Sequence, residues 1–311
     1  MLNVLHGIFA SRERTFSPGT FTLRTTSIAE PQEVLGVDYI NLVFLAYGSN
    51  GVLSTSSNGI NWTSKVSSFG TSLIYNSAYG LNQYVLVGGS GKLATSPNST
   101  NWTQVTSTFS TSSIFNVIFD GAKFIAVGAS GKMATGTLVG GVLTWSAVAD
   151  SSFGTTFIYG IAYGNSTHVA VGGSGKIAIS TDNTNTWTQV ANTFGTSQIN
   201  SIVFANSLFV AVGASGKIAT SPDGIVWTSR TNTFTNYTIK DITFGSGIFI
   251  ACGANGELSY SVDAVNWSSA TNSSGFGATL INSIAPGTVD SFPGFIIGGQ
   301  SAKVATSQVA N

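Results

Sequence analysis

Apolar residues along this chain gather in short runs that Gly, Asn, Asp and Pro turns separate. The stretch 199–234 shows the pattern most clearly: short apolar or alternating segments at 199–204, 208–213, 217–221 and 225–230 follow one another, and Thr233-Phe234 closes the unit. Runs of this length, bounded by turn residues, are typical of β-strands. Because no segment shows the period of a helix, the pattern predicts an all-β chain.

The same unit recurs along the whole chain with a period of about forty residues. A tryptophan marks six copies: Trp62, Trp102, Trp145, Trp187, Trp227 and Trp267. A Gly-rich turn marks seven, starting at Gly48, Gly88, Gly128, Gly172, Gly213, Gly253 and Gly298. Four short antiparallel strands per repeat of this length are the blade of a β-propeller. The sequence therefore predicts a single seven-bladed propeller.

The last unit, from Ile281 to Ser307, stops after its third strand. Near the other end of the chain, Ser17-Pro18-Gly19 resembles the turn Ser221-Pro222-Asp223, and the same spacing puts Leu23 in the tryptophan place. An open ring would leave two blade faces and a strand edge exposed. We therefore predict that an N-terminal strand completes the last blade, with residues 1–16 as an N-terminal arm and residues 17–311 as the propeller.

The repeated aromatic residues have a structural interpretation. We expect the tryptophans to pack between neighbouring sheets, since burying an indole removes about 150–250 Å² from water; the alternative is a ring of platforms for sugars. A phenylalanine also follows the fourth strand of most units, at Phe69, Phe109, Phe153, Phe194, Phe234 and Phe276. These side chains are expected to wedge between blades, or else to contact a ligand.

Lysine forms the one charged series in the repeat. It follows the Gly-rich turn at Lys92, Lys132, Lys176, Lys217 and Lys303, whereas Val52 and Glu257 stand at this place in the other two units. The lysines should share one face with the phenylalanine loops. There they could bind anionic groups, or they could be solvated side chains that discourage edge pairing.

Composition narrows the classes of function. Only 8% of the residues are charged and the formal net charge is zero, so no basic field exists to attract nucleic acid or anionic lipid. A near-neutral surface permits a homo-oligomer. The single cysteine, Cys252, is expected to be a packed thiol. We find no apolar run long enough to span a membrane and no signal peptide, and we expect no metal and no cofactor.

The turn before several tryptophans resembles the Asp-box hairpin of sialidase-type propellers. It carries Asp182, Asp223, Asp263 or Asn58, each two residues after a serine. The resemblance supports a propeller, in which this hairpin is structural. It also implies that a hydrolase would need three clustered arginines, a Tyr–Glu pair and an acidic residue. The chain has four arginines, Arg12, Arg14, Arg24 and Arg230, and the first two lie in the arm. We therefore expect no enzyme.

In its abundance of Ser, Thr, Asn and Gly and its degenerate repeats, the chain is similar to phage tail and fibre proteins. This likeness favours a non-catalytic virion protein (tail fibre, spike or decoration) that is assembled in the host cytoplasm and serves assembly or host-surface recognition. Residues 1–16 would dock to other virion proteins, or would form a terminus without fixed structure. Two alternatives are a free lectin-like propeller that binds host-surface glycans and a sialidase-like glycoside hydrolase.

Overall fold

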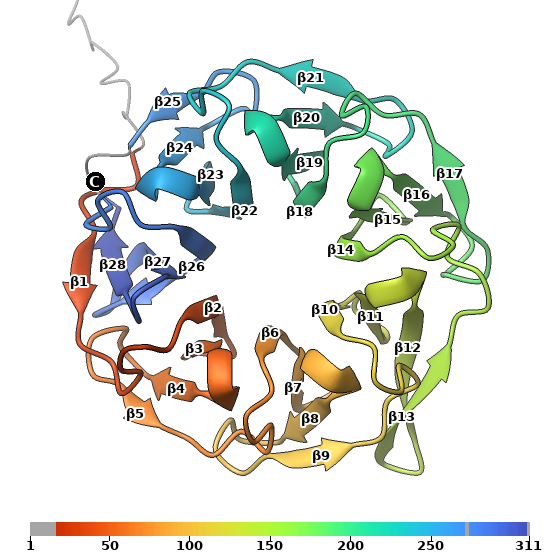
Figure 1. The fold of residues 1–311 in the computed structure, drawn as a ribbon, viewed down its shortest axis with the longest axis horizontal. Helices are drawn as coiled ribbons and strands as arrows, with labels where there is room; N and C mark the ends of the chain where they lie inside the picture. Colours follow the sequence, from red (N-terminus) through yellow and green to blue (C-terminus); the bar gives the residue numbers. More distant parts are fainter. Residues whose placement is uncertain (1–16, 271–273, 310–311) are drawn as a thin grey trace, which may run out of the picture.

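The computed structural model describes residues 17–270 and 274–309, and shows seven four-stranded antiparallel sheets arranged in a ring (Figure 1). The predicted all-β, seven-bladed propeller is confirmed. The strands of each blade follow one another from the central axis outward (Figure 1). In the described part of the chain, no helix is long and apolar enough to cross a membrane.

The bounds of the strands repeat closely from blade to blade. The innermost strands are β2 (Val34–Ile40), β6 (Ile74–Gly80), β10 (Ile114–Phe119), β14 (Ile158–Gly164), β18 (Ile199–Ala205), β22 (Ile239–Gly245) and β26 (Ile281–Val289). The second strands are β3 (Val43–Gly48), β7 (Gln83–Gly88), β11 (Phe124–Gly128), β15 (Thr167–Gly172), β19 (Leu208–Gly213), β23 (Ile248–Gly253) and β27 (Phe292–Gly299). The third strands are β4 (Leu53–Ser56), β8 (Leu93–Ser96), β12 (Met133–Val139), β16 (Ile177–Ser180), β20 (Ile218–Ser221), β24 (Leu258–Ser261) and β28 (Val304–Gln308). The outermost strands are β5 (Thr63–Ser64), β9 (Thr103–Val105), β13 (Val142–Ala147), β17 (Thr188–Val190), β21 (Thr228–Arg230), β25 (Ser268–Ser269) and β1 (Thr22–Arg24).

Apolar residues hold neighbouring blades together. The second strands, such as β23, are buried on both faces because each sheet is covered by a blade on either side, which explains their unbroken apolar sequence. Each apolar cluster joins side chains of two adjacent blades. Trp102, for example, packs with Leu45 and Tyr47 of the preceding blade. Trp102, Trp187 and Trp227 are buried, and Cys252 is a buried free thiol.

The two ends of the chain meet in the seventh blade. Strand β1 lies beside β28 (Figure 1) and pairs antiparallel with it. In this register Leu23 lies opposite Ala305. In the fifth blade, the residue opposite the equivalent Ala219 is Ser229, two positions after Trp227. The residue in the tryptophan place of the seventh blade is therefore Phe21, which is 4% exposed in the cluster between blades 6 and 7. The prediction of Leu23 for this place is wrong, since Leu23 is 50% exposed.

The two-residue error has a physical cause. In the other blades, a hairpin connects the third strand to the fourth, so the length of the turn fixes the register between them. The seventh blade has no such connection, because its third and fourth strands come from opposite ends of the chain. The spacing from Ser17 is thus free to differ from the spacing that follows Ser221.

Candidate functional site

Six 3-10 turns connect the second and third strands of blades 1–6, and they define one face of the ring, named here the turn face. They are η1 (Ser49–Gly51), η2 (Gly89–Gly91), η3 (Ala129–Gly131), η4 (Gly173–Gly175), η5 (Ala214–Gly216) and η6 (Ala254–Gly256). In η2, Gly91 has φ +65°, and a Cβ there would lie 1.9 Å from the backbone oxygen of Ser110. The amide of Gly89 donates to the carbonyl of Leu73, which places the start of the innermost strand at this face.

In five blades, a hydrogen bond between a lysine and a phenylalanine ties the blade to the loop that precedes it; this pair is named here the Lys–Phe clasp. The lysine ammonium donates to the phenylalanine carbonyl in five pairs: Lys92–Phe69 (2.6 Å), Lys132–Phe109 (2.8 Å), Lys176–Phe153 (3.0 Å), Lys217–Phe194 (2.7 Å) and Lys303–Phe276 (3.0 Å). The loop is also tied to the blade before it, since Ser67 donates to the Gly51 carbonyl and accepts from the Phe69 amide. The six phenylalanine rings are buried between blades.

The clasp gives the lysine series a structural role. Each contact uses one of the three donors of an ammonium group that is half-buried. In blade 1, Val52 takes the place of the lysine and packs against the apolar cluster between blades 7 and 1. The anion-binding role of Lys92, Lys132, Lys176, Lys217 and Lys303 stays a prediction.

Every innermost strand carries a β-bulge near its start on the turn face. The pairing with the second strand skips one residue, for example between Ile74 and Asn76. The seven skipped residues, named here the bulge ring, are Leu35, Tyr75, Phe115, Tyr159, Asn200, Lys240 and Asn282. A bulge re-aims the side chain of the extra residue and is common next to functional sites. The bulge ring therefore presents seven side chains of different chemistry around one axis.

The bulge ring has an aromatic arc and a polar arc. In blades 2–4, the ring of Phe115 lies 5.4 Å from that of Tyr75 and 5.2 Å from that of Tyr159, centroid to centroid. Phe157, which is 43% exposed, extends this arc and lies 5.7 Å from Phe115. In blades 5–7 the same positions hold Asn200, Lys240 and Asn282. The repeat pattern does not distinguish these residues, although an aromatic residue follows the first Ile of three consecutive repeats.

Two buried carboxyl groups line the central channel, a cavity of about 310 Å³. Asp38 accepts hydrogen bonds from Tyr47 and Ser77, both at 2.5 Å. Asp241 accepts from Ser201 of blade 5 (2.8 Å) and Ser283 of blade 7 (3.0 Å). Burial raises the pKa of both carboxyls; the pKa of Asp38 reaches about 7, and the nearby Asp241 contributes to this rise. Hydrogen bonds between these two carboxyl groups and serines of neighbouring blades thus hold the blades together around the channel.

The Asp38 carboxyl is expected to make stability depend on pH. The folded protein keeps the proton up to about pH 7, whereas an ordinary Asp releases it near pH 3.8, so the folded state binds more protons in between. The free energy of unfolding should therefore fall as the pH rises from about 4 to 7, by up to about 1.4 kcal/mol per pH unit, and level off above. Urea unfolding at several pH values measures this slope.

The substitution Asp38→Asn should flatten that slope, and the exposed Asp290→Asn serves as the control because it leaves the channel intact. A slope in Asp38→Asn equal to that of the unchanged protein would contradict the assignment. Asp241 contributes a slope of the same sign, since its pKa is also raised, so some dependence on pH should remain.

His168 forms a buried pair that its isolation in the sequence did not predict. Its Nε2 lies 3.0 Å from Oδ2 of Asp120 in the neighbouring blade, and its ring stacks on Tyr163 at 4.3 Å. Burial lowers the pKa of His168. Burial would raise the pKa of Asp120, but hydrogen bonds from the amides of Lys123 and Ala122 and from His168 lower it. The Nδ1 atom of His168 has no partner among the described residues, so no nucleophile completes a catalytic set there.

The arginines that a hydrolase of the sialidase type would cluster lie apart. Arg24 is on β1 and Arg230 is on β21, the outermost strands of blades 7 and 5. Arg12 and Arg14 lie outside the described residues, as does the rest of the predicted arm. Among the residues that the structure describes, no three His, Cys, Asp or Glu side chains gather closely enough to hold a metal ion.

The Asp-box-like hairpins have the expected local geometry. The Asp223 carboxylate accepts hydrogen bonds from the amides of Ile225 (2.8 Å) and Val226 (3.1 Å), and from Ser221 (2.9 Å). Asn58 accepts from the amides of Ile60 and Asn61 in the same way. In both turns the side-chain oxygen thus accepts from the amides two and three residues on. These hairpins order the turns between the third and fourth strands.

Comparison with known proteins places the chain by fold alone. No family model matches it, and no curated protein does. Among solved structures it is similar to "YCF48 bound to D1 peptide", with 15% identity, TM-score 0.73 and coverage of 94% of this chain and 96% of that one. YCF48 from Cyanidioschyzon merolae gives 14% identity, TM-score 0.72 and coverage of 93% and 98%. The WD40 β-propeller domain of Doa1 gives 11% identity, TM-score 0.71 and coverage of 94% of this chain and 97% of that one. These similarities show the propeller fold.

Proposed function

We propose that this chain is a non-catalytic propeller that binds an extended segment of a partner protein across the bulge ring. The observation that carries the proposal is the aromatic arc of Tyr75, Phe115 and Tyr159, extended by the half-exposed Phe157. Aromatic side chains gathered on an exposed surface are typical of protein-binding sites, and they often supply most of the affinity. In the polar arc opposite, the Asn200 and Asn282 amides donate to the carbonyls of Ile239 and Val34 of the next blades. Lys240 adds one ammonium for a charged group of the segment.

Peptide binding by a propeller has a parallel, since one of the similar structures is "YCF48 bound to D1 peptide". The physical logic is general. Seven innermost strands start around one axis, and their bulges present seven independent side chains, so a propeller can vary this surface without changing its core.

The test selects 12-residue peptides from a random library against the intact protein and measures their affinity by fluorescence anisotropy. Phe115→Ser should weaken binding about thirtyfold, because a central aromatic residue contributes about 2 kcal/mol. Phe292→Ser is the matched control, since Phe292 is 54% exposed at the start of β27, at the end of the β26–β27 hairpin away from the bulge ring. Selected peptides whose affinity is the same for Phe115→Ser as for the unchanged protein would refute the proposal.

As the biological setting, we propose a phage virion, in which the propeller serves assembly or host recognition as part of a tail fibre, spike or decoration protein. The low share of charged residues and the Ser-, Thr-, Asn- and Gly-rich repeats support this setting. Residues 1–16 are proposed to dock to other virion proteins. Antibodies to the propeller should label particles of the encoding phage in electron micrographs. Absence of the chain from purified particles by mass spectrometry would exclude this role.

A further inference from the structure

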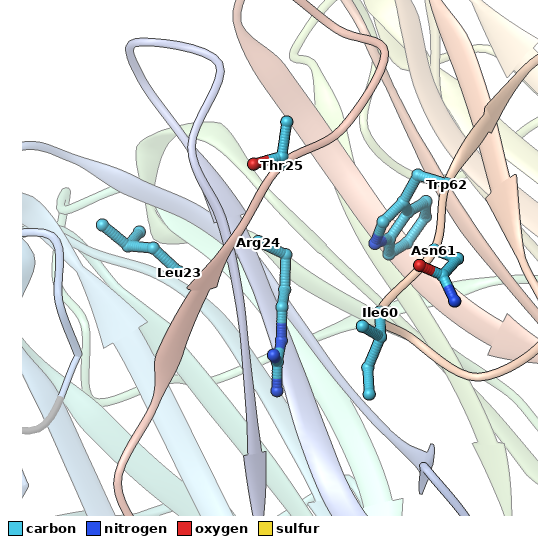
Figure 2. A pocket seen from close by; sticks show the side chains of 6 residues that line it. All are labelled: Leu23, Arg24, Thr25, Ile60, Asn61 and Trp62. Carbon is cyan, nitrogen blue, oxygen red and sulfur yellow. The ribbon is translucent and has the colours of Figure 1, made fainter.

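An open groove of about 490 Å³ lies at the rim of the ring, between blades 7 and 1. Leu23, Arg24 and Thr25 line it on one side, and Ile60, Asn61 and Trp62 line it on the other (Figure 2). The Arg24 side chain lies on the side of β1 that faces Ile60 and Asn61 (Figure 2). The groove is remote from the bulge ring, because β1 is the outermost strand of its blade (Figure 1).

The guanidinium of Arg24 is fixed in place without a charged partner. Its Nε donates to Oγ1 of Thr306 at 2.6 Å, and Arg230 makes the equivalent bond to Thr220 at 2.8 Å. Within residues 17–270 and 274–309, no carboxylate lies within 4.0 Å of either guanidinium. The terminal amino groups are therefore oriented and available, and a guanidinium matches a carboxylate with two parallel hydrogen bonds.

Arg24 lies opposite the first residue of the third strand of its blade. The equivalent position holds a cation in three blades: Arg24 in blade 7, Lys65 in blade 1 and Arg230 in blade 5. In blades 2, 3, 4 and 6 it holds an apolar residue: Val105, Val148, Val190 and Ala270. The next blade in the ring supplies the other wall, through the residue before its tryptophan. That residue is asparagine after each cation (Asn61, Asn101 and Asn266) and is Thr144, Thr186, Val226 or Thr20 after the apolar residues.

This co-occurrence indicates that the cation and the asparagine serve one purpose, because paired changes across repeats report spatial contact or a shared ligand. The Asn61 side chain makes no hydrogen bond within the described part of the chain, so the pair does not simply bond to each other across the groove. In the groove of Figure 2, the free amide, the fixed guanidinium and the partly exposed indole of Trp62 surround the same space.

We infer that the groove between blades 7 and 1 binds carboxylated sugar units of an acidic polysaccharide, and that the equivalent pairs Lys65–Asn101 and Arg230–Asn266 provide two further contacts for the same polymer. The guanidinium or ammonium takes the carboxylate, the asparagine amide can donate to and accept from hydroxyl groups, and the indole offers an apolar surface to the sugar ring. Three cation–asparagine pairs on one ring suit a polymer that repeats the same group, since linked binding events raise the overall affinity. The pairs differ in their surroundings, since Trp102 beside Asn101 is buried and the Asn266 amide donates to Asp263 at 2.8 Å. This inference is independent of the bulge ring, so Phe115→Ser should leave it unchanged.

The experiment is affinity electrophoresis, which measures how strongly the protein is retarded in gels that contain polygalacturonate, alginate, dextran or polyglutamate. The unchanged protein should be retarded by at least one of the two acidic polysaccharides and not by dextran or polyglutamate. The variant Arg24→Gln/Lys65→Gln/Arg230→Gln should lose the retardation, about tenfold or more in apparent affinity. The control variant Lys240→Gln removes one charge from the turn face without breaking a Lys–Phe contact and should keep the retardation, whereas its single-charge counterpart Arg24→Gln should weaken it. Thermal unfolding checks that each variant is folded.

A gain of binding provides a second readout. Val190→Arg with Val226→Asn builds the same pair between blades 4 and 5, where Val226 is 65% exposed, and should strengthen retardation. The inference is overturned if neither acidic polysaccharide binds, if polyglutamate binds equally well, or if the turn-face control loses binding while the rim variant keeps it.

Discussion

Deleting residues 15–27 is expected to abolish the single cooperative unfolding transition of this protein. The deletion removes β1, leaves the edge of β28 unpaired, and strips Phe21 from the cluster between blades 6 and 7. It also removes Arg24, which bonds Thr306 of β28. A ring depends on every interface, because one open blade exposes apolar faces on both sides. Since domains are stable by only about 5–15 kcal/mol, losing one interface should be close to global unfolding.

The measurement compares thermal unfolding by far-UV circular dichroism and by tryptophan fluorescence, which should coincide for the intact protein and separate or vanish for the deletion. Two point variants act as controls. Phe21→Ser should lower the transition temperature strongly, and Leu23→Ser should change it little, because Leu23 is half-exposed. A deleted chain that unfolds in one transition at the original temperature would show that β1 does not close the ring.

The phenylalanine of a clasp should be the most costly single side chain to remove from a blade interface. Phe153 is fully buried between blades 3 and 4, and its backbone carbonyl accepts from Lys176. Phe153→Ala leaves a cavity that a rigid sheet interface cannot fill, so the free energy of unfolding should fall by about 3–5 kcal/mol. Urea unfolding measures the change.

A neighbouring phenylalanine provides the comparison. Phe157 is only four residues away but is 43% exposed, so Phe157→Ala should cost well under half as much. Lys176→Met keeps the aromatic wedge and removes only the hydrogen bond from its ammonium, and about 1.5–3 kcal/mol is expected. If Phe153→Ala and Phe157→Ala cost the same, the wedge between blades is not the source of stability.

The sequence was enough for the architecture because each blade repeats the same physical requirements. The apolar second strands must be buried on both faces, and the Gly-rich turns must reach left-handed φ values, as in η2. Because these signals occur seven times, they predict the number of blades. The roles of Phe69 and its equivalents could also be predicted, since their place after the fourth strand leaves only the interface between blades for a large apolar ring.

Strand registers and contacts between residues that lie far apart in the sequence could not be predicted. The spacing from Ser17 does not predict the register of Leu23, because no hairpin joins β28 to β1. His168 and Asp120 are 48 residues apart in sequence, and only the packing of blade 4 against blade 3 brings them to 3.0 Å. The bulge ring was invisible for another reason: a residue skipped by the strand pairing looks like any other strand residue until the register is known.

The closure of the ring in this register is tested most directly by a disulfide. Directly opposed residues of antiparallel strands have Cα atoms about 4.5–5.5 Å apart, which a disulfide can span. In a Cys252→Val background, which removes the native thiol, Leu23→Cys with Ala305→Cys should oxidise to a single cross-linked species that peptide mass spectrometry identifies. Cross-linking of Thr25→Cys with Ala305→Cys instead, or of neither pair, would contradict the account.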